Sequence, residues 1–217
     1  MNDPDSTERR DQIAANLATV HGRIATACAD AGRDAGEVQL VVVTKFFPAS
    51  DVRLLAELGV TDVGENRHQE AEAKAAAVAA YADVVESVDR AKLVGPLARG
   101  AERRGQPVDV LLQVSLDPPG AEGRSGADPD DLPGLAAAVA GADGLRLRGL
   151  MAVAPLGEEP AAAFDRLARI RRGFLVDHPE AGWLSAGMSG DLEEAVRAGA
   201  THVRVGSAVL GSRPKFK

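Results

Sequence analysis

The sequence has one cysteine, four histidines and few aromatic residues. A single cysteine, Cys28, excludes an internal disulfide, and the scattered histidines lack metal-ligand spacing, so we expect no metal site. Aromatic residues make up 3% of the chain, too few for platforms that stack single-stranded nucleic acid. The chain is acidic, with net charge −7, and has no long basic stretch. We therefore do not expect nucleic acid as a partner.

Long apolar runs are also missing. No stretch approaches the roughly 18 apolar residues of a membrane span, and residues 1–10 are charged and polar. We therefore expect no membrane span and no signal peptide, and we place the protein in the reducing cytoplasm. A length of 217 residues with 45% hydrophobic content fits a single domain over 1–217, of the size of an α/β barrel.

The hydrophobic pattern alternates between strand-like and helix-like segments. Such alternation indicates βαβ units and a parallel sheet, so the predicted fold is α/β, a TIM-type (β/α) barrel preceded by an extra N-terminal helix. A closed barrel of this type has eight strands, and the sequence predicts seven. The predicted strands cover 39–45, 62–66, 83–88, 108–115, 145–153, 183–187 and 202–206. The predicted helices cover 7–32, 49–58, the alanine-rich segment to about 80, 89–104, 131–141, 160–177, 190–198 and a short turn at 208–210.

Helix ends are predicted from capping residues. Asp5 or Ser6 is expected to cap the first helix, and Ser50 the helix over 49–58, which Gly59 should end. Cys28 continues the apolar spacing of the first helix, so we expect it to be buried.

Lys45 ends the most apolar of the early strands, 39–45. A strand this apolar is expected to be buried on both faces, and ligands bind at the carboxyl ends of parallel strands. Burial would lower the pKa of the Lys45 amine and make it a nucleophile. The alternative is a lysine whose stem packs while its ammonium reaches water.

Three further strand ends carry small or polar residues. Asn66 follows Gly64, and it would either face a ligand or cap the next helix. Ser189 lies between Gly187 and Gly190 before an acidic helix start, which indicates an anion cradle or ordinary helix capping.

Arg204 alternates with apolar neighbours on the last predicted strand, so it should point inward and needs an acceptor there. The alternative is a structural salt bridge. Gly206 and Ser207 follow on the loop where barrel enzymes commonly bind phosphate. An amine, a phosphate cradle and an inward arginine match the aldehyde, phosphate and ring nitrogen of pyridoxal 5′-phosphate (PLP).

These segments resemble the motifs of the pyridoxal phosphate homeostasis protein family, single-domain relatives of the alanine racemase barrel. The resemblance covers about residues 8–213 and keeps the motifs in order; they are 43–45, 64–66 with 69–70, 185–191 and 203–206. It implies a PLP barrel of fold type III. The resemblance further implies PLP held as a Schiff base on Lys45, phosphate contacts from Ser189 and the Gly206 and Ser207 backbone, Arg204 facing the pyridine nitrogen, and Asn66 near the ring.

One segment departs from the family pattern. The family carries a Trp-His-Phe-Ile-Gly strand and a Leu-Gln-x-Asn-Lys segment after the Gly-Glu-Asn helix, and neither occurs between residues 70 and 84 here. The barrel then either closes with seven strands or has a gap, or the sequence omits residues. The Gly123–Gly126 loop resembles the family's Lys-Ser-Gly loop, with Arg124 for lysine.

The resemblance and the chemistry together favour a cofactor carrier or buffer over an enzyme. An arginine at the ring nitrogen weakens the electron sink, and racemases of the related barrel take a tyrosine acid/base from a second domain. The one tyrosine here, Tyr81, follows a predicted helix, so we expect no catalytic residue. We expect the protein to be a monomer, with PLP and PLP-dependent apoenzymes as its partners. A PLP-dependent racemase-like enzyme and a class I aldolase-type lyase remain the alternatives.

Overall fold

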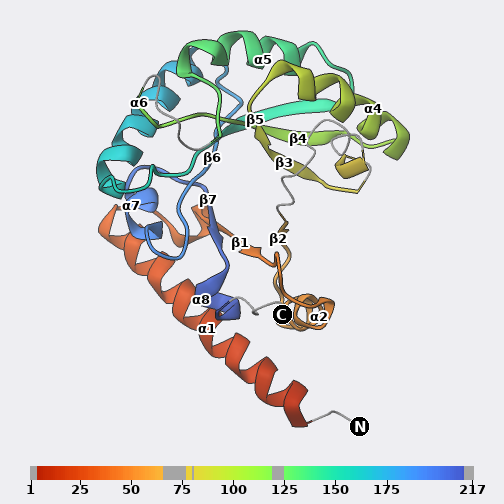
Figure 1. Ribbon diagram of the computed structural model, residues 1–217. Helices are drawn as coiled ribbons and strands as arrows, with labels where there is room; N and C mark the ends of the chain where they lie inside the picture. Colours follow the sequence, from red (N-terminus) through yellow and green to blue (C-terminus); the bar gives the residue numbers. More distant parts are fainter. Residues whose placement is uncertain (1–3, 66–76, 80, 119–124, 213–217) are drawn as a thin grey trace. The chain divides into compact units, whose positions relative to one another are not determined.

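The computed structural model describes residues 4–65, 77–79, 81–118 and 125–212. Strands and helices alternate along the chain, as the colours of Figure 1 show. The backbone forms two compact units, one of residues 1–67 with 187–217 and the other of residues 68–186. Every strand pairing described within either unit is parallel, which confirms the predicted α/β class.

The first unit begins with the long helix α1 (Pro4–Asp30). Its apolar residues recur every three or four positions and are buried against the strands and helices of this unit, as predicted. Cys28 is fully buried, in agreement with the sequence analysis. Asp5 and Ser6 lie inside the first turn because the helix already begins at Pro4, so the predicted cap at these residues is wrong.

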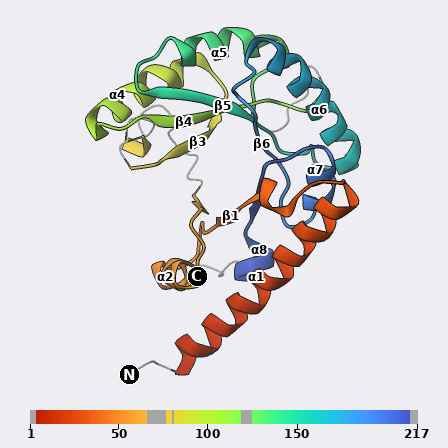
Figure 2. The ribbon, with the colours of Figure 1, turned by 180° about the vertical axis from the view of Figure 1, so that it is seen from behind.

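The sheet of the first unit has the order β2-β1-β7, with β1 (Gln39–Val43) in the middle. β2 (Val63–Gly64) contributes two residues and β7 (His202–Val205) four. Helices α2 (Ala49–Glu57), α7 (Leu192–Arg197) and α8 (Ser207–Leu210) and the 3₁₀ turn η1 (Ala35–Glu37) complete this unit. Figure 2 shows α1 passing along α7 and α8.

Side chains on β1 and β7 alternate between two faces. Leu40 and Val42 on β1, with Val203 and Val205 on β7, are buried in a core shared with α1. Val41 and Val43 face the other way and are half-buried, so the prediction that this strand is buried on both faces is wrong.

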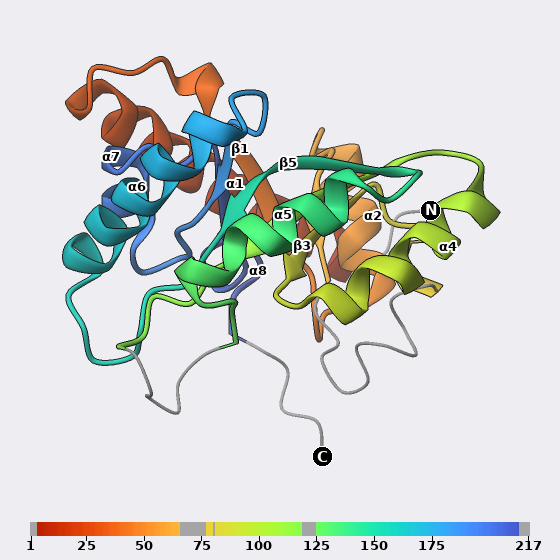
Figure 3. The same ribbon diagram turned by 90° about the horizontal axis from the view of Figure 1, so that it is seen from above.

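The second unit has the strand order β6-β5-β4-β3. β4 is its most buried strand, with all six residues buried. Figure 3 shows α4 and α5 lying across these strands, and both contact β4 and β5. The strands are β3 (Val84–Val88), β4 (Val108–Gln113), β5 (Leu145–Met151) and β6 (Trp183–Ser185). The helical elements are η2 (Ala91–Leu93), α4 (Val94–Arg104), η3 (Pro129–Asp131), α5 (Leu132–Ala140) and α6 (Pro160–Asp177).

One hydrogen bond shows that the sheet of the second unit is strongly curved. The Ser185 hydroxyl on β6 donates to the Glu86 carboxylate on β3 over 3.0 Å, although β5 and β4 lie between them. In a flat sheet, strands spaced about 4.8 Å apart would separate these two positions by about 14 Å. The sheet must therefore curl strongly, as the strands of a (β/α) barrel do.

The predicted strands, and the predicted helices that lie in the described part of the chain, are confirmed in order, with ends that differ by a few residues. Ser50 does not cap α2, because Pro48 holds the extended backbone before the helix and Ser50 already lies in its first turn. Gly59 ends that helix as predicted, with φ of 84°. Of the residues described between β2 and β3, none forms a strand; the alanine-rich helix predicted there falls mostly on residues 66–76, outside the described part of the chain.

The loop that resembles Lys-Ser-Gly is described only at Ser125 and Gly126. Gly126 lies against the Ser115 backbone, where an added Cβ would come within 2.4 Å of the Ser115 nitrogen. Ala127 continues β4's pairing through a bridge to Val114, so this part of the loop extends the sheet. Within the described ranges, no helix is long and apolar enough to cross a membrane.

Candidate functional site at the ends of β1 and β7

Lys45 occupies a tight turn directly after β1. The Thr44 carbonyl accepts a hydrogen bond from the Phe47 N–H over 3.0 Å, which closes a four-residue turn with Lys45 at its second position. Phe46 at the third position has φ of 74°, a conformation that costs a bulky residue free energy. Lys45 is half-buried. The turn therefore fixes the direction in which the lysine leaves the strand.

Thr44 ties the end of β1 to the end of β2. Its hydroxyl donates to the Glu65 carboxylate over 2.6 Å, and its N–H donates to the Gly64 carbonyl over 3.0 Å. Thr44 is 1% exposed, so these bonds lie out of water on the threonine side. Asn66, the next residue along, lies outside the described residues, and its predicted place near a ligand stays a prediction.

Arg204 lies beside β1 on the face opposite to the α1 core. Val41 is its partner in the parallel pairing of β1 and β7, and paired residues of parallel strands share a face. Val203 and Val205 on either side of it are fully buried against the helices, whereas Arg204 is half-buried. The predicted alternation, with the arginine turned away from the helices, is confirmed.

Gly206 brings the end of β7 close to the end of β1. A Cβ added at Gly206 would lie 3.2 Å from the Val43 carbonyl oxygen and 3.4 Å from the Val43 Cβ. A larger residue would push against β1 two positions before Lys45. The glycine therefore allows the start of the Ser207 turn to sit against the strand that carries the lysine.

Ser189 faces the start of α8. Its hydroxyl accepts hydrogen bonds from the Ala208 N–H and from the Ser207 hydroxyl, both over 3.3 Å. The Gly187 carbonyl accepts the N–H of Arg204 over 2.9 Å, so the loop that carries Ser189 is also joined to β7. Hydroxyls and backbone N–H groups thus converge between this loop and α8, as an anion requires.

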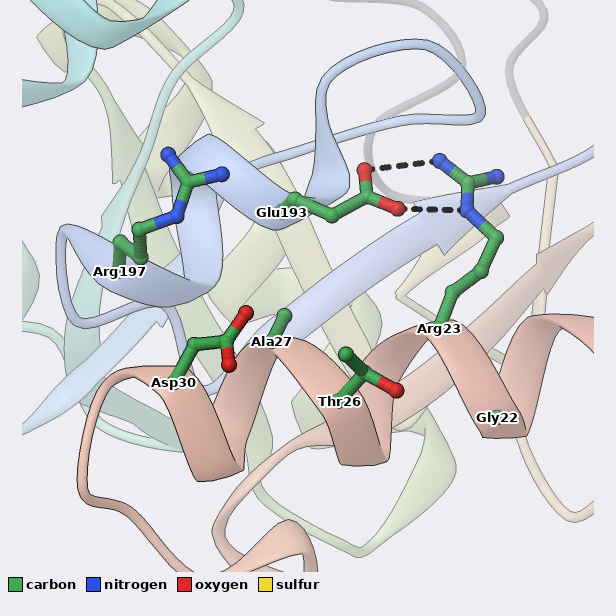
Figure 4. Close-up of a pocket in the computed structure, with 7 residues that line it drawn as sticks. All are labelled: Gly22, Arg23, Thr26, Ala27, Asp30, Glu193 and Arg197. Atoms are coloured by element: carbon green, nitrogen blue, oxygen red, sulfur yellow. Dashed lines mark hydrogen bonds and ion pairs between the residues drawn. The ribbon is translucent and has the colours of Figure 1, made fainter.

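Asp191 and Arg23 hold the two sides of Ser189, and sequence reasoning missed both roles. The Asp191 carboxylate accepts the Met188 N–H over 2.6 Å, so it fixes the loop and makes no side-chain bond to the α7 backbone. The Arg23 guanidinium on α1 donates to the Ser189 carbonyl over 3.0 Å. Arg23 also donates twice to the Glu193 carboxylate, over 2.6 and 2.8 Å, as Figure 4 shows.

The Arg23–Glu193 pair perturbs both groups. Its hydrogen bonds hold the pKa of the Glu193 carboxyl below its ordinary value and raise the pKa of Arg23, while partial burial opposes both shifts. The pair borders a hollow of ≈ 300 Å³ between α1 and α7. The lining residues are Gly22, Arg23, Thr26, Ala27, Asp30, Glu193 and Arg197.

α1 holds α8 as well as α7. Arg9 donates to the Leu210 carbonyl over 2.9 Å and pairs with Asp51 of α2 over 2.6 Å, while Asn16 donates to the Val209 carbonyl over 2.8 Å. The five predicted site residues that the structure describes, Lys45, Ser189, Arg204, Gly206 and Ser207, therefore belong to one unit that α1 fastens together. In the described part of this chain, no three metal-ligating side chains cluster.

The chain is similar to known proteins over nearly its whole length. The family described as alanine racemase, N-terminal domain, matches residues 10–214. The pyridoxal phosphate homeostasis protein of Mycobacterium tuberculosis is 39% identical over 246 aligned residues, 95% of each protein. That of Pseudomonas aeruginosa is 39% identical over 222 residues, 93% of this chain and 96% of that protein. The 246 aligned positions exceed the 217 residues here, so the mycobacterial protein has residues without a counterpart.

Solved structures agree with these relatives. PipY of Synechococcus elongatus PCC7942, solved with PLP bound, has a TM-score of 0.77 and 30% identity, covering 92% of this chain and all (100%) of PipY. An unknown protein from Bifidobacterium adolescentis has a TM-score of 0.80 and 30% identity, and the match covers 96% of this chain and 97% of that protein. Alanine racemase of Clostridium difficile shares the fold, with a TM-score of 0.70 at 13% identity. The predicted alanine racemase-like barrel class is confirmed.

Proposed function

The chain belongs to the pyridoxal phosphate homeostasis protein family, and on this premise we propose that it binds PLP and acts as a carrier or buffer of that cofactor. The observation that carries the proposal is the pairing of β1 with β7, which brings Lys45, Arg204 and Gly206 to neighbouring strand ends. The family match over 10–214 includes both compact units. We therefore infer that the two units form one PLP-binding domain.

Lys45 is the residue that would hold the aldehyde. Its amine nitrogen would form a C=N bond with the aldehyde carbon, a Schiff base, and one water would leave. The turn from Thr44 to Phe47 supports this role because it fixes where the half-buried side chain starts. When bound, the cofactor supplies an aldehyde and an electron-withdrawing ring.

The phosphate fits the groups between the 187–190 loop and α8. The Ser189 hydroxyl and the backbone N–H groups of Gly206 and Ser207 are donors of the type that phosphate oxygens accept. The close approach at Gly206 supports the fit, since an added Cβ there would lie 3.2 Å from the Val43 carbonyl oxygen and press on β1 beside these donors. Arg204 would face the pyridine nitrogen, and Asn66 would lie near the ring.

A carrier role is supported by the names of the relatives and by the proposed partner of the ring. An arginine disfavours protonation of the pyridine nitrogen, which weakens the ring's capacity to stabilise a carbanion. Tyr81, the chain's one tyrosine, is 72% exposed. We propose that the protein has no catalytic turnover of its own, acts in the cytoplasm as a monomer and passes PLP to apoenzymes.

The alanine racemase domain match favours one second candidate, a PLP-dependent racemase-like activity. A racemase must exchange the α-proton of its amino acid with solvent. Incubation of the PLP-loaded protein with amino acids in deuterated water would separate the two functions, because a carrier leaves the α-proton in place.

The test of PLP binding is a titration of cofactor-free protein followed by visible absorbance. We expect a band in the wild type and in Lys92→Ala, whose lysine is exposed on η2, and none in Lys45→Ala. A band of equal size in Lys45→Ala would refute the assignment of Lys45, and no band in the wild type would refute PLP binding as a Schiff base.

A further inference from the structure

Arg23 uses one guanidinium to connect three parts of the first unit. Its Nε and one Nη donate to Glu193 on α7 over 2.6 and 2.8 Å, and its other Nη donates to the Ser189 carbonyl over 3.0 Å. This bidentate hydrogen bonding to a carboxylate requires the planar guanidinium of an arginine, which a lysine lacks. The pair thus holds the guanidinium in a defined orientation on the backbone of the 187–190 loop.

The charge pair alone would be of little consequence. Arg23 and Glu193 have side chains that are 30% and 32% exposed, and exposed pairs contribute little to stability. The contact to a main-chain carbonyl is different, because it fixes the backbone of a loop that has glycines at 187 and 190. Glycine on both sides gives that loop more conformational freedom to lose.

Two bonds bracket Ser189 along the backbone. The Asp191 carboxylate accepts the N–H of Met188, which precedes Ser189, and Arg23 donates to the carbonyl of Ser189 itself. Between these two fixed points the Ser189 hydroxyl lies 3.3 Å from the Ala208 nitrogen. Loss of the bond to the Ser189 carbonyl would free the peptide unit between Ser189 and Gly190, which adjoins the Cα that carries the hydroxyl.

We propose that Arg23 is a positioning residue for phosphate, which acts through Ser189 without contacting the cofactor. It fixes the Ser189 hydroxyl at the place where the phosphate binds, and Glu193 keeps the guanidinium aimed at the loop. This proposal rests on the proposed PLP-binding function. A positioning role differs from a role in merely holding α1 to the unit. If Arg23 positions Ser189, its loss should lower the affinity only for ligands that carry a phosphate.

The test compares PLP with pyridoxal, which has the same aldehyde and ring and no phosphate. Titrations of cofactor-free Arg23→Lys, followed by the visible band that depends on Lys45, should show PLP affinity about tenfold weaker, the scale of one lost hydrogen bond. Affinity for pyridoxal should stay at the wild-type value. Equal losses for both ligands, or no loss for PLP, would overturn the proposal.

Arg33→Lys is the matched control. Arg33 follows α1 and belongs to the same unit. Its guanidinium donates to the Val196 carbonyl on α7 over 2.7 Å and to the Glu37 carboxylate over 3.2 Å. Its loss should leave the PLP and pyridoxal affinities in their wild-type ratio. Should Arg23→Lys fold poorly, Glu193→Gln removes the charge that aims the guanidinium and should weaken PLP affinity selectively as well.

The double variant Arg23→Lys/Ser189→Ala tests the route. If Arg23 acts through Ser189, the double variant should bind PLP as weakly as Ser189→Ala alone. Additive losses would contradict that route. A wild-type protein that shows no Lys45-dependent band would overturn the proposed function, whereas a wild type that binds and an Arg23→Lys variant with unchanged PLP affinity would overturn this inference alone.

Discussion

The backbone N–H of Arg204 donates to the carbonyl of Gly187 over 2.9 Å. This bond joins the loop that carries Ser189 to the strand that carries the inward arginine. Because β7 also pairs with β1, residues far apart in the sequence are brought to one edge of a small parallel sheet. The predictions that follow test whether that edge holds the cofactor.

Ser189→Ala should weaken PLP retention by roughly 1–3 kcal/mol, the cost of leaving one phosphate contact unmet. Equilibrium titration of the visible band measures the change, and Ser50→Ala, on the exposed first turn of α2, is the control. Unchanged retention in Ser189→Ala would remove this serine from the site.

Arg204→Glu should change the spectrum of bound PLP. A carboxylate beside the pyridine nitrogen raises the pKa of that nitrogen, so the ring should carry a proton at neutral pH where the wild type carries none. A pH titration of the absorbance spectrum measures the shift. Arg172→Glu, at an exposed position on α6, makes the same charge change. Identical titration curves for the wild type and Arg204→Glu would place this arginine away from the ring.

Gly187→Ala should destabilise the fold by about 1–3 kcal/mol, because Gly187 has φ of 90°. An added Cβ would also lie 2.6 Å from the Ala195 Cβ. Gly173→Ala is the matched substitution inside helix α6, where an added Cβ meets nothing within 4 Å, and it should stabilise by about 0.5–1 kcal/mol. Denaturant unfolding of the two variants should give changes of opposite sign, and changes of the same sign would contradict this account of Gly187.

Acid should destabilise the wild type more than Glu193→Gln. The hydrogen bond from Arg23 lowers the pKa of Glu193 below its ordinary value of 4.5 in the folded protein. A carboxyl with a lowered folded pKa stabilises the fold above its unfolded pKa, and this contribution is lost as the pH falls through the folded pKa. Other carboxyls titrate alike in both proteins, so the difference in unfolding free energy between them should shrink below pH 4.5. A constant difference would contradict an ionised, paired Glu193.

Sequence periodicity predicted the strands and helices well because their burial patterns are local. The apolar spacing of α1 and the alternation around Arg204 both follow from which face of an element meets the core. Helix starts were predicted less well. Ser50 was expected to cap α2, but proline at 48 supplies the extended residue before the helix and leaves Ser50 in its first turn.

The contacts that hold the candidate site could not be predicted in the same way. Arg23 and Glu193 lie 170 positions apart, and nothing in a single sequence pairs one surface arginine with one glutamate over that separation. The acidic helix start after Ser189, which contains Asp191 and Glu193, is typical of ordinary helix capping, and the position of Glu193 in the first turn of α7 also satisfies that role. How the barrel is completed without the family strand between residues 70 and 84 stays a prediction, because residues 66–76 and 80 lie outside the described part of the chain.

Borohydride reduction of the PLP-loaded protein, followed by digestion and peptide mass analysis, locates the covalent bond most directly. Reduction turns a C=N bond into a stable amine, so the lysine that holds the cofactor keeps it through digestion. The account predicts that the modified peptide contains Lys45, in the wild type and in Arg23→Lys alike. A cofactor fixed to another lysine, or a loaded protein that retains none after reduction, would contradict it.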